Sequence, residues 1–154
     1  LDLAENDVLD ICTNSINSVL SNNPDVKIIN NMSSDVEVIC DIKALSQVID
    51  NLIENSVKYG VSEECNEIII NVKDQGSKVR FEIEDRGQGI PADQRERVFE
   101  RFFRIQNNNT SVKEGTGLGL SIVKNLVNLM GGSVGNEKAY PAGTIFWFTL
   151  NKKN

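Results

Sequence analysis

Apolar residues recur along this chain in two periods: every third or fourth position in some segments, and every second position in others. The longer period predicts three helices, at residues 5–21, 43–59 and 118–130. Strict alternation predicts a hairpin of two half-buried strands, at residues 68–72 and 79–83. Shorter β-prone runs predict further strands, at residues 26–32, 36–40, 133–137 and 144–150. We expect the first two of these runs to form a strand pair, and we expect a short helix at residues 92–101.

These elements place the chain in the α+β class. About three main helices packed on a mixed, mostly antiparallel sheet of about five strands predict a two-layer α/β sandwich. With 154 residues, 40% of them hydrophobic, the chain can build one ordinary core, so we expect a single domain over residues 1–154. A polar stretch rich in asparagine, residues 106–114, has no periodicity and is expected to be a mobile loop.

Charge and cysteine content narrow the classes of function. A net charge of −6 and a pI near 4.7 argue against a nucleic-acid partner, which would usually meet a basic face. Three cysteines without a CxxC pair or any histidine make a zinc site or a disulfide a weak interpretation, and reduced thiols fit a cytoplasmic domain. No apolar run approaches the ~18 residues of a membrane helix. We expect a soluble cytoplasmic fragment, which leaves open how the parent protein is anchored.

The polar face of the helix predicted at residues 43–59 carries side chains suited to a phosphate and its metal ion. At about 100° per residue, Asn51, Asn55 and Lys58 share this face, with Tyr59 at its margin. Neutral amide oxygens are hard ligands of the kind that Mg²⁺ accepts beside substrate phosphates and waters. Any amphipathic helix also has a polar outer face, so a merely solvated surface stays open as an alternative.

Asp85 follows an alternating strand and has the same parity as the apolar positions of that strand. Its carboxylate is therefore expected to point inward, where it needs a hydrogen-bond partner. An exocyclic amine such as adenine N6 can supply that bond. Gly87 and Gly89 would let the backbone approach a ligand closely. A strand-ending turn with a solvated aspartate is the alternative.

The sequence GTGLGL, residues 115–120, immediately precedes a strongly predicted helix. Backbone amides and the positive end of the helix dipole together favour an anion at such a place. The spacing fits neither the P-loop nor the dinucleotide-binding glycine pattern, and glycines that only open a helix remain an alternative. The sequence ERFFR, residues 100–104, brings two phenylalanines expected in the core or under a loop, and arginines of which one can steady a terminal phosphate.

In this order, the motifs resemble those of the catalytic ATP-binding domain of bacterial sensor histidine kinases, a branch of the family that includes gyrase and Hsp90. QVIDNLIENSVKYG at 47–60 resembles the N box of that family, and DRGQGIP at 85–91 resembles its first glycine box. VFERFFR at 98–104 resembles the phenylalanine box, and GTGLGL resembles the second glycine box. Gly143 and Thr144 resemble the last, weaker box. The resemblance spans nearly the whole chain and implies a sandwich of the Bergerat type.

The resemblance implies a role for each matching residue. Asn55 would bind Mg²⁺ with support from Asn51, Lys58 would contact phosphate, and Arg104 would approach the γ-phosphate; these four are the expected catalytic residues. Residues 105–116 would form a lid over ATP. The residues implied for nucleotide binding are Asn55, Lys58, Tyr59, Asp85, Gly87, Gly89, Ile90, Phe102, Arg104, Gly115, Thr116, Gly117, Leu118, Gly119, Leu120 and Thr144.

The resemblance also implies an activity. Such domains bind ATP with Mg²⁺ and transfer its γ-phosphoryl group to a histidine on a separate dimerisation domain, from which a response regulator takes it. This chain contains no histidine, so the acceptor must belong to another domain. We expect the fragment itself to be monomeric.

Other functions stay open. An ATPase of the gyrase branch would need a carboxylate to activate water; Asn51 stands where that branch has Glu, and Glu54 lies about 60° away on the helix wheel. A nucleotide-gated binding module would order its lid on ATP and transfer nothing. A serine kinase of the same superfamily is a further variant, which the phenylalanine box disfavours.

Overall fold

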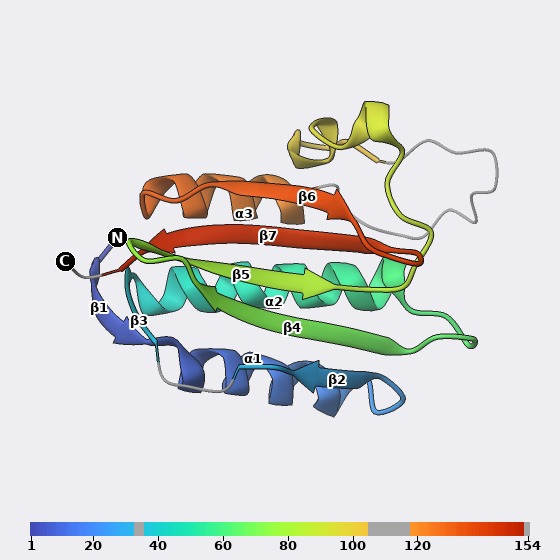
Figure 1. Ribbon diagram of the computed structural model, residues 1–154, viewed down its shortest axis with the longest axis horizontal. Coiled ribbons are helices and arrows are strands. Elements are labelled where there is room, and N and C mark those ends of the chain that lie inside the picture. Colours follow the sequence, from blue (N-terminus) through green and yellow to red (C-terminus); the bar gives the residue numbers. More distant parts are fainter. Residues whose placement is uncertain (33–35, 105–117, 153–154) are drawn as a thin grey trace.

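The computed structural model describes residues 1–32, 36–104 and 118–152. Within them, a five-stranded sheet in the order β2-β4-β5-β7-β6 forms one layer, and three helices cover one face of it (Figure 1). The strands are β2 (Lys27–Asn30), β4 (Glu67–Asp74), β5 (Lys78–Glu84), β6 (Val134–Lys138) and β7 (Thr144–Asn151). The helices are α1 (Val8–Asn22), α2 (Ile42–Gly60) and α3 (Gly119–Leu129). β2 is parallel to β4 and the other neighbouring strands are antiparallel, so the sheet is mixed and mostly antiparallel as predicted. With helices on one face of this sheet, the predicted two-layer sandwich is confirmed.

The N-terminal part of the chain differs from its prediction. The side chain of Asp7 accepts a hydrogen bond from the N–H of Leu9 at 2.9 Å and caps α1, so the helix begins at Val8. The residues before it form β1 (Ala4–Asp7), which pairs antiparallel with β3 (Glu37–Cys40). The predicted pairing of the runs at 26–32 and 36–40 is therefore wrong, because a short apolar run indicates a strand without specifying its partner.

Residues 92–101 form two separate 3-10 turns, Ala92–Gln94 and Arg97–Phe99, where a short helix was predicted. The N–H of Gln94 donates to the carbonyl of Pro91 at 2.9 Å, and the N–H of Glu100 donates to that of Arg97 at 2.9 Å. Within these ten positions only Val98 and Phe99 are buried. A longer helix would have no apolar stripe to pack on the core, which is the main source of helix stability in proteins.

The central helix, α2, lies between α1 and α3 and packs against both. Asp41 caps it by accepting a hydrogen bond from the N–H of Ala44 at 2.9 Å. Val48, an apolar exception on the predicted polar face, is fully buried, because the flanking helices widen the covered arc beyond the side that meets the sheet. None of the helices in the described part of the chain is long and apolar enough to cross a membrane.

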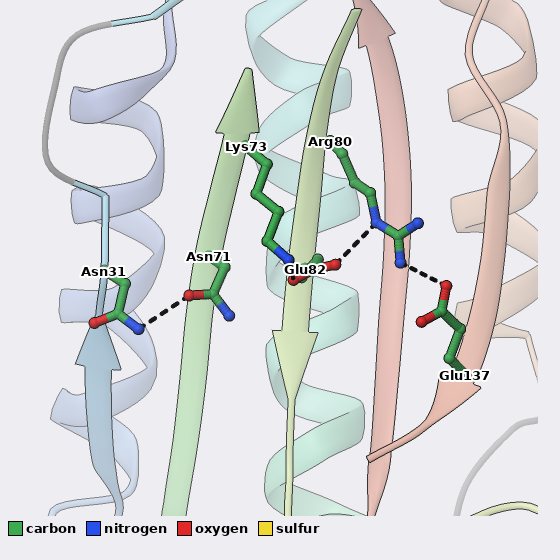
Figure 2. Close-up of polar contacts among 6 residues, drawn as sticks. All are labelled: Asn31, Asn71, Lys73, Arg80, Glu82 and Glu137. Atoms are coloured by element: carbon green, nitrogen blue, oxygen red, sulfur yellow. Dashed lines mark hydrogen bonds and ion pairs between the residues drawn. The ribbon is translucent and has the colours of Figure 1, made fainter. Parts of the chain in front are cut away.

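The face of the sheet that the helices leave open carries a network of polar contacts (Figure 2). Its centre is Glu82 on β5, whose side chain lies 3.1 Å from the Lys73 ammonium and 2.9 Å from Nε of Arg80. Arg80 also pairs with Glu137 on β6 at 2.7 Å, and its guanidinium lies over the Trp147 ring at 4.7 Å. Glu82 is only 5% exposed although it lies on the uncovered face of the sheet. These side chains therefore cover β5 with paired charges.

Candidate functional site

Asp85 lies directly after β5 with its side chain inside the protein, 4% exposed. Its Oδ1 accepts hydrogen bonds from the N–H of Gly87 at 2.9 Å and from the N–H of Thr144 at 3.3 Å. Its own N–H donates to the Thr144 carbonyl at 2.9 Å. The carboxyl group is thus fixed between the end of β5 and the start of β7.

Burial raises the pKa of the Asp85 carboxyl above its ordinary value, because the charged form loses hydration. The N–H groups of Gly87 and Thr144 act in the opposite direction, and so do Ser56 on α2 and the charge of Arg86. The Ser56 hydroxyl is close enough to lower this pKa, but the two groups do not meet the geometry of a hydrogen bond. Ionisation of the Asp85 side chain therefore carries an energetic cost that a hydrogen-bond donor on a ligand would reduce.

The corner around this carboxyl depends on two glycines that have no room for a side chain. A Cβ placed on Gly60, at the end of α2, would overlap the Asp85 carboxyl group. Gly143 has φ +107°, and a Cβ there would overlap the backbone carbonyl of Asp85. Sequence reasoning did not single out Gly60 or Ser56, because a glycine at a helix end reads as a simple terminus and its contact with Asp85 is tertiary.

The predicted polar residues of α2 lie on one helix whose end meets the Asp85 corner. Asn51, Asn55 and Lys58 are partly exposed, and Tyr59 is 43% exposed with the Lys58 ammonium 5.5 Å from its ring centroid. The Asn51 Nδ2 is buried and has no hydrogen-bond partner among the described residues. Gly87 packs so closely on the end of α2 that a Cβ on it would lie 2.7 Å from the Tyr59 carbonyl. The structure therefore joins this helix face to the turn that carries Asp85.

The segment after Asp85 leads away from this corner. Gly89 has φ +80°, a backbone conformation that side chains other than glycine rarely adopt, and Ile90 is partly buried against the core. Further on, Phe102 is 66% exposed, has φ +63° and lies under the Arg101 guanidinium at 5.5 Å. A positive φ at a bulky residue is uncommon. The exposed ring shows that Phe102 is not a core residue.

Arg104, the last described residue before the gap in the chain, is exposed at the end of this segment. Beyond the gap, Leu118, Gly119 and Leu120 form the partly exposed first turn of α3, where the Ser121 hydroxyl donates to the Leu118 carbonyl at 2.8 Å. The predicted lid over residues 105–116 lies outside the described residues, and so do three predicted phosphate-binding residues, Gly115, Thr116 and Gly117.

The described residues contain no cluster of three histidine, cysteine, aspartate or glutamate side chains that could hold a metal ion.

Residues 40–154 match the model of the histidine kinase-, DNA gyrase B- and HSP90-like ATPase family. The chain belongs to this family. Its relatives include the sensory/regulatory protein RpfC of Xanthomonas campestris, which is 40% identical over 71% of this chain. The sensor histidine kinase WalK of Bacillus subtilis is 35% identical over 77% of this chain. The alignments span only 16% of RpfC and 20% of WalK, so this chain corresponds to a small part of either protein.

A solved structure supports the same assignment. The mycobacterial sensor histidine kinase MprB superimposes with a TM-score of 0.85 and 26% sequence identity, covering 98% of both chains. The family expected from the motifs is thereby confirmed, as is the fold that it implied. The chain is an ATPase-family domain of the type found in sensor histidine kinases.

Proposed function

We propose that residues 1–154 form one catalytic domain that binds ATP with Mg²⁺ and supplies its γ-phosphoryl group to a histidine on a separate dimerisation domain. The buried Asp85 carboxyl is the observation that carries this proposal. Oδ1 is held by two backbone N–H groups, and a donor on a ligand would offset the remaining cost of burial. The adenine amine is such a donor, and a guanine would present a carbonyl acceptor there.

The α2 face supports the phosphate and metal part of the proposal. The side-chain oxygens of Asn51 and Asn55 suit Mg²⁺, which takes few protein ligands when substrate phosphates and waters complete its shell. The absence of an acidic cluster in the described residues agrees with such a shell. When bound, the ion neutralises charge that develops on the transferred phosphoryl group. Asn55 would hold it with support from Asn51, and Lys58 would contact phosphate.

Three further contacts complete the proposed nucleotide site. Tyr59 lies beside the adenine, Arg104 approaches the γ-phosphate, and the first turn of α3 with the glycines before it cradles the phosphates. The positive end of α3 makes its N-terminal turn favourable for an anion. Gly87, Gly89, Ile90, Phe102 and Thr144 belong to the same proposed site.

The acceptor must come from elsewhere because the chain contains no histidine. In the transfer, the bond between the γ-phosphorus and the β–γ bridging oxygen breaks, a phosphorus–nitrogen bond to the imidazole forms, ADP leaves, and the imidazole loses a proton. The protein contributes mainly position and charge. The partners implied are a dimerisation domain, which bears the histidine, and a response regulator that acts downstream.

Phosphate transfer to an added domain tests the proposal. The chain, labelled ATP and Mg²⁺ are incubated with and without a histidine-bearing dimerisation domain of the parent kinase. We expect saturable ATP binding by calorimetry without sustained heat, and acid-labile, base-stable label on the added domain only. Replacing the acceptor histidine by alanine should abolish the label.

Other outcomes separate the competing functions. Sustained heat without label transfer would indicate an ATPase, and Glu54→Gln would then test the carboxylate in question, which is exposed on α2. Binding with neither turnover nor transfer would indicate a nucleotide-gated binding module. Acid-stable label would indicate a serine kinase. No binding of ATP would refute the proposal.

A further inference from the structure

The segment of residues 91–104 crosses from the Asp85 corner to Arg104 without a strand, and with only the two 3-10 turns as regular structure. Its backbone bonds from Gln94 to Pro91 and from Glu100 to Arg97 join residues three apart, and each closes a single turn. Such turns do not tie a segment to the rest of a domain. The position of Arg104 therefore depends on side chains that fasten this segment to the sheet and to α3, which the turn at Arg97–Phe99 contacts.

Two neighbouring positions on the sheet supply fastening contacts. Asn136 on β6 donates from Nδ2 to the carbonyl of Arg95 at 2.8 Å, across 41 positions of sequence. Phe146 on β7 meets Phe99 edge to face, with ring centroids 6.2 Å apart. Asn136 and Phe146 are direct cross-strand partners. The sheet thus contributes one polar and one apolar contact from adjacent strands, while the buried side chains of Val98 and Phe99 pack in the core and their turn contacts α3.

The amide of Asn136 is retained at an energetic cost. Its Oδ1 is buried and has no hydrogen-bond partner among the described residues, a situation that destabilises the folded state because the oxygen has lost its hydration. The reverse orientation would place that oxygen against the Arg95 carbonyl, acceptor to acceptor, so the donor faces the segment. An apolar side chain of similar volume would fill this place without the cost. Asn136 therefore contributes to the structure through its Nδ2 donor, which bonds to the Arg95 carbonyl.

We propose that Asn136 is a positioning residue: its hydrogen bond to the Arg95 carbonyl fixes the segment of residues 91–104 so that Arg104 stays within reach of the terminal phosphate of bound ATP. This inference rests on the proposed function. Asn136 itself touches neither nucleotide nor metal. It acts through the backbone of the segment that ends in Arg104.

The ratio of ATP affinity to ADP affinity distinguishes a positioning role from a merely structural one, which would leave this ratio unchanged. Asp85 lies before the segment and would bind the adenine of both nucleotides, whereas Arg104 would meet only the γ-phosphate, which ADP lacks. Loosening the segment should therefore weaken the binding of ATP and leave the binding of ADP unchanged. Asn136→Leu removes the donor and the unpaired buried oxygen while keeping similar volume, and the Arg95 carbonyl that loses its donor belongs to a partly exposed residue, so the melting temperature should change little.

The test is calorimetric titration of ATP and of ADP, each with Mg²⁺, into the full chain and its variants. For Asn136→Leu we expect the ATP dissociation constant to rise about threefold to tenfold, as for a mutation that acts on a contact through intervening structure, while that of ADP changes less than about twofold. In an Arg104→Ala background, the same substitution should have no further effect on ATP. Such non-additivity is the signature of two residues that act through one contact.

Asn66→Leu is the matched control. Asn66 also donates from Nδ2 to a backbone carbonyl 41 positions away, that of Asp25 at 2.6 Å, but it joins the opposite edge of the sheet. It should leave the ratio of ATP to ADP affinity unchanged. Should Asn136→Leu fail to fold, Asn136→Val provides the same loss of donor with less bulk.

Unchanged ATP affinity, equal losses for ATP and ADP, or additive effects with Arg104→Ala would each overturn the positioning role while leaving the proposed function intact. A wild-type chain that binds neither nucleotide would overturn both.

Discussion

At the scale of single residues, Asp85 places stability and binding in conflict. Because burial raises its pKa, the folded chain holds this proton more tightly than the unfolded chain does. Between the ordinary pKa of 3.8 and the raised value, the folded state binds more protons than the unfolded state. The free energy of unfolding therefore falls as pH rises through that window and is level above it. Ionisation of Asp85 therefore lowers the stability of the folded chain, while a carboxylate is the form that best accepts a hydrogen bond from a ligand.

Replacing Asp85 by Asn should separate the two properties. The side-chain oxygen can still accept from Gly87 and Thr144, and no charge is buried, so the nucleotide-free variant should melt at or above the wild-type temperature at pH 7. That difference should shrink as pH falls towards 3.8 and vanish below it, where the wild-type carboxyl is protonated in both states. Affinity for both ATP and ADP should drop about tenfold to a hundredfold, as expected for loss of a charge-assisted bond. Thermal melts across pH and calorimetric titrations check these results.

Glu63→Gln is the control, because Glu63 is an exposed carboxylate in the connection after α2. It should change neither the melting temperature nor the affinities. If Asp85→Asn were strongly destabilised, the cost of burying this carboxylate would be refuted. If it bound ATP as well as the wild type, the assignment of Asp85 to the adenine amine would have to be abandoned.

The sequence carried much of this residue-level information. The parity of Asp85 along its strand predicts an inward side chain, and the structure buries it. The neighbours that enclose it, Gly60 and Ser56 from α2, could not be found in the same way. They lie far from Asp85 in sequence, and no local period reports a contact between a helix end and a strand end.

At the scale of elements, the charged side chains of Figure 2 cover the central strand β5 on the open face of the sheet. The Glu82 side chain is 6% exposed and contacts both Lys73 and Arg80, whereas the Glu137 side chain is 51% exposed and contacts only the far end of Arg80 among the described residues. Removing the charge of a buried ion-pair partner lowers the free energy of unfolding more than removing that of an exposed partner, because the remaining charges lose a stronger interaction.

Two isosteric substitutions compare these positions. Glu82→Gln should lower the free energy of unfolding by about 1–3 kcal/mol, because two cations lose their buried counter-charge, with the smaller values favoured by the exposure of Lys73. Glu137→Gln should cost less than about 1 kcal/mol. Urea unfolding at low and at high salt measures both. Added salt should shrink the Glu137 effect more than the Glu82 effect, since exposed pairs are screened more strongly. Equal midpoints for the two variants would show that burial of Glu82 does not strengthen its pairs.

The prediction of helices and strands succeeded where a regular apolar pattern runs over many residues and packs on one continuous surface of the core. The helix at 43–59 and the hairpin strands appear close to their predicted bounds. It failed where pairing is long-range: β1 and β3 associate across the whole of α1, and β2 adds to β4 in parallel. The short helix at 92–101 was also wrong, because its exposed charged residues leave packing only for Val98 and Phe99.

At the scale of the whole molecule, the proposed site draws on segments that meet only in the folded chain: the polar face of α2, the ends of β5 and β7, and the first turn of α3. A ligand that needs all of these segments should stabilise the folded state by mass action. At 100 times its dissociation constant, ATP with Mg²⁺ should add about 2.7 kcal/mol. For a chain of this size, that corresponds to a rise of roughly 5–10 °C in melting temperature.

Removing the metal ion should remove part of that rise in melting temperature, and the metal-dependent part should require Asn55. In wild-type protein, a chelator should shrink the shift given by ATP, because the phosphates lose the cation that Asn55 is proposed to hold. Asn55→Ala should show the smaller shift already with Mg²⁺ present, and the chelator should then change it little. Gln47→Ala, an exposed amide on the same helix, should keep the full metal-dependent shift. If Asn55→Ala kept it as well, the ion would have to be held by other oxygens, and Asn55 would belong to the solvated face that any amphipathic helix presents.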